Sequence, residues 1–363
     1  MKQSPRRKWL TDFSSEQRKH PDAWGKRRGA DVGARRLRGM ALVCGMFVVC
    51  ATVLACQVPV FRYALERWAP DRYQITVLSH GPLTEEEGKA LAALKSASRR
   101  GDQIEVKQVD LTQSGSPSLL KIWQQNIAAG ANAGQALILA GYPAASTVPG
   151  DQYACQLTLN EQNVAALESS PARKEIARRL ADGQSAVWIL LESDNDQKNH
   201  AARETLENQL LLDTAFLKLP SPEELEVDPR VLSEARIPLR IEFSVVTVRR
   251  NDPAEKFLVE SLLNSEADLR DFGDDPLAFP IFGRGRVLYA LVGKGIAEDT
   301  IRSASSFIVG PCSCQVKSQN PGFDLLLDHD WNKSIGDTLI SDPLPDVPKQ
   351  PTQIAIPPGK KSE

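Results

Sequence analysis

Apolar and polar positions divide residues 62–310 into two successive series of short runs. Runs such as 73–79 and 185–193 are rich in β-branched and large apolar residues, which is typical of strands. Between such runs, apolar residues recur three and four positions apart, which predicts amphipathic helices. Strands that alternate with helices indicate βαβ units and an α/β fold. We expect one α/β module at 62–183 and a second at 184–310.

The second series has the clearer order of elements. It runs strand, helix, strand, helix, Pro280, and then two apolar runs on either side of a Gly-Arg-Gly-Arg turn at 283–286, with a last helix at 296–308. Glycines between two apolar runs predict a β-hairpin. This order resembles the thioredoxin-like fold, in which a proline, usually cis, precedes the hairpin; Pro280 matches it. The first series resembles a looser copy. The expected fold class is therefore α/β, with two tandem thioredoxin-like modules after an N-terminal helix.

The chain departs from this family at the position of the catalytic dithiol. The resemblance implies a Cys-x-x-Cys between the first strand and the next helix, because a helix N-terminus stabilises a thiolate. Residues 193–196 of the second module read Ser-Asp-Asn-Asp, and the first module has His80, Gly81 and Pro82 near this position. Neither segment contains a cysteine. We therefore expect a non-catalytic protein that needs no cofactor.

A long uncharged run precedes both modules. Residues 39–61 contain no charged side chain in 23 positions, enough at about 1.5 Å per residue to cross a hydrocarbon layer of about 30 Å. Arg35, Arg36 and Arg38 adjoin its N-terminal side, and this bias favours the cytoplasm for that side. We predict a basic cytoplasmic tail at 1–38, a single transmembrane helix at 39–61, and a body outside the cytoplasm, in the periplasm.

Cys56 leaves a second kind of anchor open. Residues 53–56 resemble a bacterial lipobox, in which the cysteine becomes the lipidated N-terminus after cleavage. A signal peptide normally has a short basic n-region, whereas 38 residues, several of them acidic, precede this apolar run. A lipoprotein anchored at Cys56 would carry its body on the same side of the membrane.

The charge of the chain is divided unevenly. The net charge is -2, but residues 1–38 hold 12 Lys/Arg and 4 Asp/Glu, so the tail carries +8 and the remainder -10. An acidic body argues against nucleic acid as its partner. The expected partners are membrane lipid, through the N-terminal helix, and a protein.

Cys312 and Cys314 are the strongest candidates for chemistry. Thiols one residue apart can close a small disulfide or present two sulfurs to a soft metal. His329 is the nearest histidine in the sequence, whereas a zinc site needs four ligands. Two alternatives stay open: a structural loop pair, or a disulfide from one of them to Cys155. A thiol-disulfide or metal-handling protein is therefore the second functional hypothesis.

Two further features complete the prediction from sequence. Residues 311–335 form a cysteine-containing extension, and the Pro-rich polar residues 336–363 predict a disordered tail. The exposed ends of the predicted strands also carry four arginines that can form a basic patch if the strand and the hairpin are adjacent; they are Arg249, Arg250, Arg284 and Arg286.

The chain as a whole resembles a bacterial membrane-anchored envelope protein. Because the fold order comes without the dithiol, the leading hypothesis is a binding or accessory protein. In it, two thioredoxin-like modules act as a rigid scaffold for a protein partner near the membrane.

Overall fold

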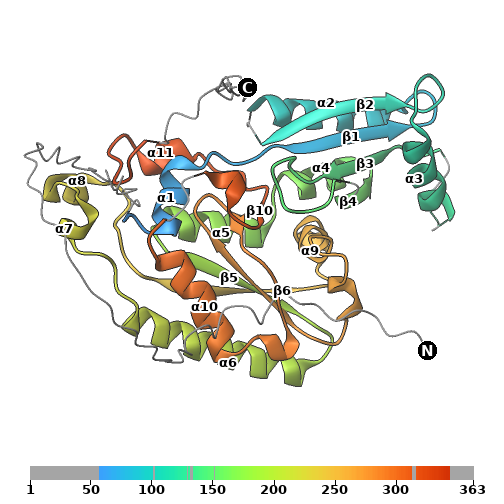
Figure 1. Ribbon diagram of the computed structural model, residues 1–363. Coiled ribbons are helices and arrows are strands. Elements are labelled where there is room, and N and C mark those ends of the chain that lie inside the picture. Colours follow the sequence, from blue (N-terminus) through green and yellow to red (C-terminus); the bar gives the residue numbers. More distant parts are fainter. Residues whose placement is uncertain are drawn as a thin grey trace, which may run out of the picture. The chain divides into compact units, whose positions relative to one another are not determined.

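The computed structural model describes residues 57–100, 103–128, 130, 134–150, 152–312 and 316–343 (Figure 1). These residues belong to one unit and have the predicted α/β architecture, built on two β-sheets. The basic tail, most of the predicted transmembrane helix, Cys56, Cys314 and residues 344–363 lie outside the described part. Within the described residues, no helix is both long enough and apolar enough to cross a membrane.

The first sheet consists of β1 (Tyr73–Ser79), β2 (Ile104–Asp110), β3 (Leu137–Gly141) and β4 (Tyr153–Thr158), in the spatial order β2-β1-β3-β4. β1 and β2 are parallel, β3 is antiparallel to β1, and β4 is antiparallel to β3. Its helices are α2 (Glu85–Arg100), α3 (Pro117–Ala128) and α4 (Glu161–Glu168). α2 starts at a capping box: Glu87 N donates to Thr84 Oγ1 at 3.2 Å, and Thr84 N donates to the Glu87 carboxylate at 2.9 Å.

The second sheet consists of β5 (Ala186–Glu192), β6 (Phe243–Arg249), β7 (Leu277–Phe282), β8 (Arg286–Val287), β9 (Leu291–Val292) and β10 (Phe323–Asp324). Its main path is β10-β8-β7-β5-β6, and β9 also pairs with β7. β5 and β6 are parallel, β7 is antiparallel to β5, and β8 is antiparallel to β7. Strands β5 to β8 therefore repeat the order and the directions of strands β1 to β4.

Helices cover both faces of the second sheet. One face carries α6 (Asp196–Phe216) and α10 (Glu298–Val309), and the other carries α5 (Pro171–Ala181) and α9 (Lys256–Leu263). β5 shows why both faces are covered: Ile189 belongs to the core beneath α5 and α9, and its neighbours Trp188 and Leu190 to the core beneath α6 and α10. A strand buried on both faces gives a continuous apolar run in the sequence. The remaining short helices are α7 (Pro222–Leu225), α8 (Pro229–Glu234), α11 (Trp331–Ile335), η1 (Pro253–Glu255), η2 (Leu269–Asp271), η3 (Gly293–Gly295) and η4 (Lys317–Gln319).

The first described helix, α1 (Val60–Arg67), is buried in the body. It packs against α10 and β7, in the same core as Trp188. The sequence predicts residues 58–61 as the end of the transmembrane helix and Tyr63 and Trp68 as residues at the membrane interface. Here Tyr63 is 0% and Trp68 3% exposed, within the protein core. Apolar residues suit a membrane and a protein core equally, so their pattern alone does not separate the two.

The turn between β7 and β8 fits closely against α1. Gly285 N donates to Phe282 O at 3.1 Å, and Gly283 and Gly285 have φ of 60° and 105°, values that glycine adopts without steric cost. A Cβ added at Gly283 would lie 2.6 Å from the Cβ of Ala64 in α1. The predicted hairpin is therefore present, and its first glycine also allows the close approach of the helix.

Pro280 differs from its predicted role. It does not precede the hairpin but lies within β7, opposite Trp188, and its carbonyl accepts a hydrogen bond from Leu288 N at 3.1 Å. The described residues contain no cis peptide bond. Pro280 is therefore a trans proline inside a strand.

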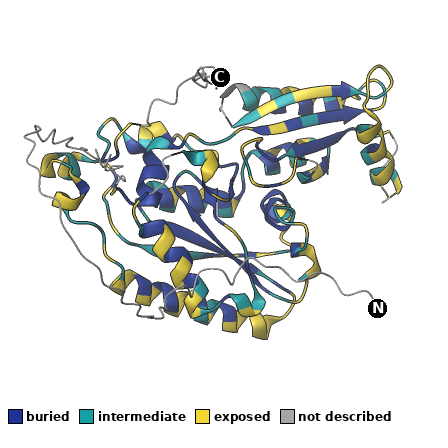
Figure 2. Ribbon diagram, in the orientation of Figure 1, coloured by how far each residue is buried: buried dark blue, intermediate teal, exposed yellow. Residues whose placement is uncertain are grey.

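One hydrophobic core extends through both sheets (Figure 2). It joins Ile75 of β1 and Ala154 of β4 to Ile189 of β5 and Phe257 of α9. α9 packs against β4, while α5 packs against β5 and β6. α5 thus lies on the second sheet, although the predicted boundary at residue 183 assigns it to the first module. The two sheets are parts of one folded body.

Residues 336–343 differ from the disorder predicted for them. Ile340 and Ser341 are buried, and their backbone N–H groups donate to the Glu66 carboxylate of α1 at 3.0 and 2.7 Å. The C-terminal segment therefore closes over the first helix.

Candidate functional site

Cys312 is the one described member of the predicted cysteine pair. It follows α10 and is 1% exposed, in the core beneath α6 and α10. Its backbone N–H donates to Val58 O at 3.0 Å, so this segment runs beside the chain that enters α1. A sulfur buried to this extent is out of reach of an exchange partner in solvent. Its pairing with Cys314, which lies outside the described residues, stays a prediction.

Cys155 is a buried free thiol on β4. It belongs to the core that spans both sheets, whereas Cys312 belongs to the core on the other face of the second sheet. Burial raises the pKa of the Cys155 thiol to about 12. The disulfide between Cys155 and Cys312 that the sequence leaves open is absent from the described residues, and the Cys155 thiol is a core side chain.

His329 lies in the loop before α11 and is half-buried. Its Nε2 is 2.8 Å from Ser334 Oγ, and its ring packs edge-on to Trp331 with centroids 4.6 Å apart. Burial lowers the pKa of His329 below its usual value, so the imidazole is neutral at pH 7. A neutral histidine beside a hydroxyl is the first part of a nucleophilic arrangement. Within the described residues, however, no group accepts a hydrogen bond from Nδ1 to orient the ring.

A metal site is not formed by the residues that the structure describes. They include no group of three or more His, Cys, Asp or Glu side chains placed to hold an ion. Cys312 and His329, the described members of the predicted set, are each engaged locally as given above.

The positions at which the sequence resemblance implies a Cys-x-x-Cys are occupied by residues with local hydrogen bonds and ring contacts. Asn199 Oδ1 accepts hydrogen bonds from the N and Oγ of Ser193, at 2.9 and 3.0 Å. Asn195 Oδ1 accepts from Lys198 N at 3.0 Å and so caps α6. In the first module, His80 stacks on Trp123 and Gly81 N donates to Asp110 at 3.0 Å. Both positions are occupied by local structure.

The four arginines of the predicted basic patch do not meet. In β5, Glu192 pairs with Arg249 at one end, while Val187 pairs with Ile281 near the turn that carries Arg284 at the other end. Five residues of strand separate these ends, about 16 Å. Arg249 is 80% exposed near Glu192, and Arg250 donates to Asp275 O at 2.6 Å. The sheet thus places the two pairs at opposite edges.

Arg284 caps the C-terminal end of α1. Its Nε donates to Leu65 O at 2.7 Å and its Nη2 to Glu66 O at 3.0 Å. The last carbonyls of a helix have no partner within it and carry partial negative charge, so a guanidinium there is stabilising.

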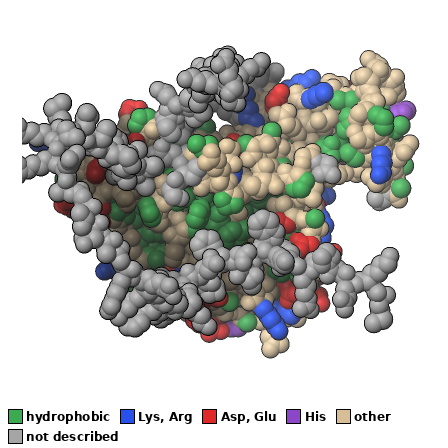
Figure 3. All heavy atoms as spheres, in the orientation of Figure 1, with side chains coloured by type: hydrophobic (Ala, Val, Ile, Leu, Met, Phe, Trp, Pro, Cys, Tyr) green, Lys and Arg blue, Asp and Glu red, His purple; other side chains and the backbone are tan. Residues whose placement is uncertain are grey.

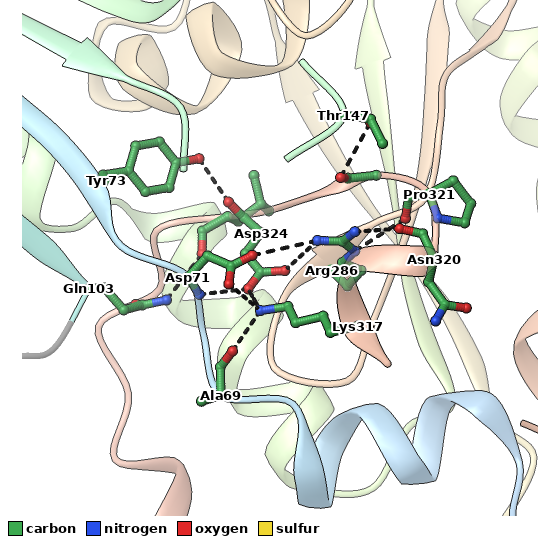
Figure 4. A network of polar contacts seen from close by, with 12 residues as sticks. Ala69, Asp71, Tyr73, Gln103, Thr147, Arg286, Lys317, Asn320, Pro321 and Asp324 are labelled. Carbon is green, nitrogen blue, oxygen red and sulfur yellow. Dashed lines mark hydrogen bonds and ion pairs between the residues drawn. The ribbon is translucent and has the colours of Figure 1, made fainter. Parts of the chain in front are cut away.

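Arg286 lies at the centre of a buried polar network where β8, β10 and the segment before β1 meet (Figure 4). Its side chain is 2% exposed and lies 3.3 Å from Asp324 and 3.7 Å from Asp71. It also donates to Asn320 O at 2.7 Å. One guanidinium compensates only one of the two carboxylates, so a second cation is needed for the charges to balance.

Lys317 supplies the second cation of this network. Its ammonium group pairs with Asp324 and lies 3.0 Å from Asp71. Tyr73 OH donates to Asp324 O at 2.8 Å and Asp71 N donates to Asp324 Oδ2 at 2.8 Å. Burial, and then the neighbouring Asp324, raises the pKa of Asp71 above its ordinary value. The network thereby ties the start of β1, in the first sheet, to β8 and β10 of the second.

A cleft with a volume of about 530 Å³ lies next to this network. Its walls come from Gln103 at the start of β2, from Arg284, and from residues 326–332. Gln103 holds the last of these walls in place: its Oε1 accepts from Leu327 N at 3.1 Å. Asp328 and His329 also line a second cleft of about 450 Å³ on the side of α5. The loop at 326–332 is thus open to solvent on two sides.

The sequence predicts His329 as a metal candidate and Arg284 as part of a basic patch, and the structure places both in the wall of the cleft. The missed signal is Asp324, a carboxylate inside the apolar run at 323–327, because a charge buried in such a run must have a partner.

No protein-family model matches the chain, and no curated protein matches it significantly.

Proposed function

We propose that this chain is a membrane-anchored, extracytoplasmic and non-catalytic binding protein that presents a rigid body to a protein partner. The anchor is the uncharged run that ends near residue 57, as a single-pass helix or as a lipid on Cys56. The body is two thioredoxin-like modules without a dithiol.

The repeated strand order supports the thioredoxin-like part of the proposal. In each module a parallel pair linked by a helix precedes an antiparallel pair. The trans Pro280 and the capping groups at 193–199 depart from a redox-active member. These departures favour a fold kept for binding rather than for disulfide exchange.

The cleft beside residues 326–332 is the observation that carries the binding proposal. Its walls come from both sheets, which share one core and the Arg286 network, so its shape is held in place. Asp328 is exposed there, and Asp330 adds a second carboxylate. Arg284, the cation in the wall, already donates to Leu65 and Glu66 carbonyls. Acidic groups beside His329 and Trp331 suit a basic segment of a protein.

The test is crosslinking of the full chain in its native membrane, followed by identification of captured proteins. We expect Asp328→Arg to reduce capture of the partner about tenfold, because it replaces an attractive charge with a repulsive one. Glu204→Arg, at an exposed site on α6 outside the cleft, is the matched control and should capture the partner like the native chain. Equal capture by both variants would place the partner elsewhere and reject the cleft.

The anchor is tested separately. We expect the full chain to stay with membranes after carbonate extraction. Mass spectrometry of the mature N-terminus then separates the helix from a lipid on Cys56. A chain that carbonate releases would overturn the proposed anchor.

A further inference from the structure

The most exposed apolar side chains of the described part gather at the end of one helix. Leu211 is 71%, Phe216 69% and Leu212 45% exposed, all in the last two turns of α6. Phe307, 36% exposed, lies in the last turn of α10, the helix packed beside α6. A group of exposed large apolar residues indicates a surface that contacts a membrane or another protein.

The topology brings these helix ends to the same edge of the second sheet. α6 leaves β5 at its end and returns the chain toward β6, which runs parallel to β5, so α6 ends where β5 begins. α10 starts after β9, which pairs with Leu277, the partner of Leu191 at the end of β5. It therefore also runs back toward the edge where β5 begins, and Figure 1 shows its end beside α1. Figure 3 gives the same view with all heavy atoms and with side chains coloured by type.

The chain enters the body at this same edge. Val60 N donates to Gly310 O at 2.9 Å, directly after α10, and Pro59 forms a bridge with Pro311. Val58 is 3% exposed, so the packed body begins there, one residue after the start of the described part. No flexible spacer separates residue 57 from α1.

The length of the preceding run fixes the distance to the membrane. Residues 39–56 are 18 uncharged positions. As the proposed membrane helix they would span about 27 Å at about 1.5 Å each, close to the whole hydrocarbon thickness of about 30 Å. All of them would then be needed to cross the bilayer, which places Gln57 at the membrane surface. A body attached there without a spacer has its entry edge against the bilayer.

We infer that the edge formed by the last turns of α6 and α10 lies on the lipid bilayer, with Leu211, Leu212, Phe216 and Phe307 in the interface. This inference rests on the proposed membrane anchor. Lys218 is exposed two residues beyond Phe216, and its ammonium group can reach lipid phosphate while its stem stays among apolar groups. The bilayer therefore fixes the orientation of the body as well as its location.

Photocrosslinking of the full chain tests this contact. Phe216 is replaced by p-benzoylphenylalanine and the chain is reconstituted in vesicles of phosphatidylethanolamine and phosphatidylcholine. Leu120, an exposed apolar residue of α3 on the other sheet, carries the same label as the matched control. After irradiation, mass spectrometry should find a phospholipid adduct on the peptide that contains position 216, at least tenfold more abundant than at position 120.

The other outcomes separate this inference from the anchor. If carbonate leaves the chain in the membrane, but position 216 links to protein or yields no more lipid adduct than position 120, the contact is overturned and the anchor stands. A link to protein would identify a second copy or a partner as the occupant. If carbonate releases the chain, both are overturned.

Discussion

Glu66 and Ser341 join the two ends of the described body. Ser341 donates to the Glu66 carboxylate from its backbone N at 2.7 Å and from its Oγ at 2.6 Å, across 275 positions of sequence. The same carboxylate pairs with Arg62 at 2.7 Å, and neither side chain is more than 2% exposed. A buried pair of this kind is costly to break, because removal of one partner leaves the other charge uncompensated.

Glu66→Ala should therefore lower the free energy of unfolding of the full chain by roughly 3–5 kcal/mol, measured by urea denaturation in detergent. Glu85→Ala is the control, because Glu85 forms a salt bridge of the same i,i+4 spacing with Lys89 but is 84% exposed. Its effect should stay within about 0.5 kcal/mol. Similar losses in the two variants would contradict the burial argument.

Arg284 and Arg249 give a second matched pair. Arg284→Ala removes two hydrogen bonds to the last carbonyls of α1 and should lower the free energy of unfolding by roughly 2–3 kcal/mol. The Arg249 side chain is 80% exposed, so Arg249→Ala should lower the free energy of unfolding by no more than about 0.5 kcal/mol. Thermal denaturation of both variants checks the difference, and an unaffected Arg284→Ala would remove the capping role.

His329 should make the body less stable in mild acid. Burial lowers its pKa in the folded protein, so the folded state binds the proton less readily than the unfolded state. The stability that depends on a neutral His329 is fully present above the unfolded pKa of about 6.5. It is lost progressively as the pH falls through that value toward the folded pKa. Denaturation between pH 7.5 and 5, in steps of roughly half a pH unit, should show this loss, and His329→Gln should reduce the slope. An unchanged slope would assign the effect to other groups.

Cys155 should resist alkylation until the body unfolds. With its pKa raised to about 12, only about one thiol in 10⁴ is ionised at pH 8, and its side chain is buried. Iodoacetamide labelling followed by mass spectrometry should therefore be at least about 100-fold slower in buffer than in denaturant. Labelling in buffer at the rate of an unfolded thiol would show that β4 opens readily.

The local pattern of the sequence predicted most of the elements. The run at 185–193 contains β5, and 73–79 is β1, because strand residues and their neighbours in the chain carry the signal. The glycines at 283 and 285 likewise predicted the β7–β8 turn. Such features depend on residues close in sequence, which periodicity can detect.

Features that depend on distant partners were not predictable in this way. The sequence around Arg286 predicts an exposed charge, because its partners Asp324 and Asp71 are distant from it in the chain. The sequence predicts Tyr63 as a membrane-interface residue. The core that buries it comes from α10 and β7, more than 200 positions later in the chain, and local pattern cannot show it. The cleft has the same origin, since its walls come from Gln103 and from residues 326–332.

The position of α1 also constrains the order in which the protein can fold. α1 is synthesised before nearly all of the body, yet the groups that bury it are Gly283, the end of α10, and Ile340 and Ser341. Contacts across so many residues form late, since their loops close at high entropic cost. Until those later residues have been synthesised and have folded, the apolar surface of α1 lacks the groups that bury it in the folded protein. The first helix of the body is therefore the last one to be fully packed. A chain that ends before residue 340 lacks the hydrogen bonds that Ile340 and Ser341 donate to Glu66 of α1.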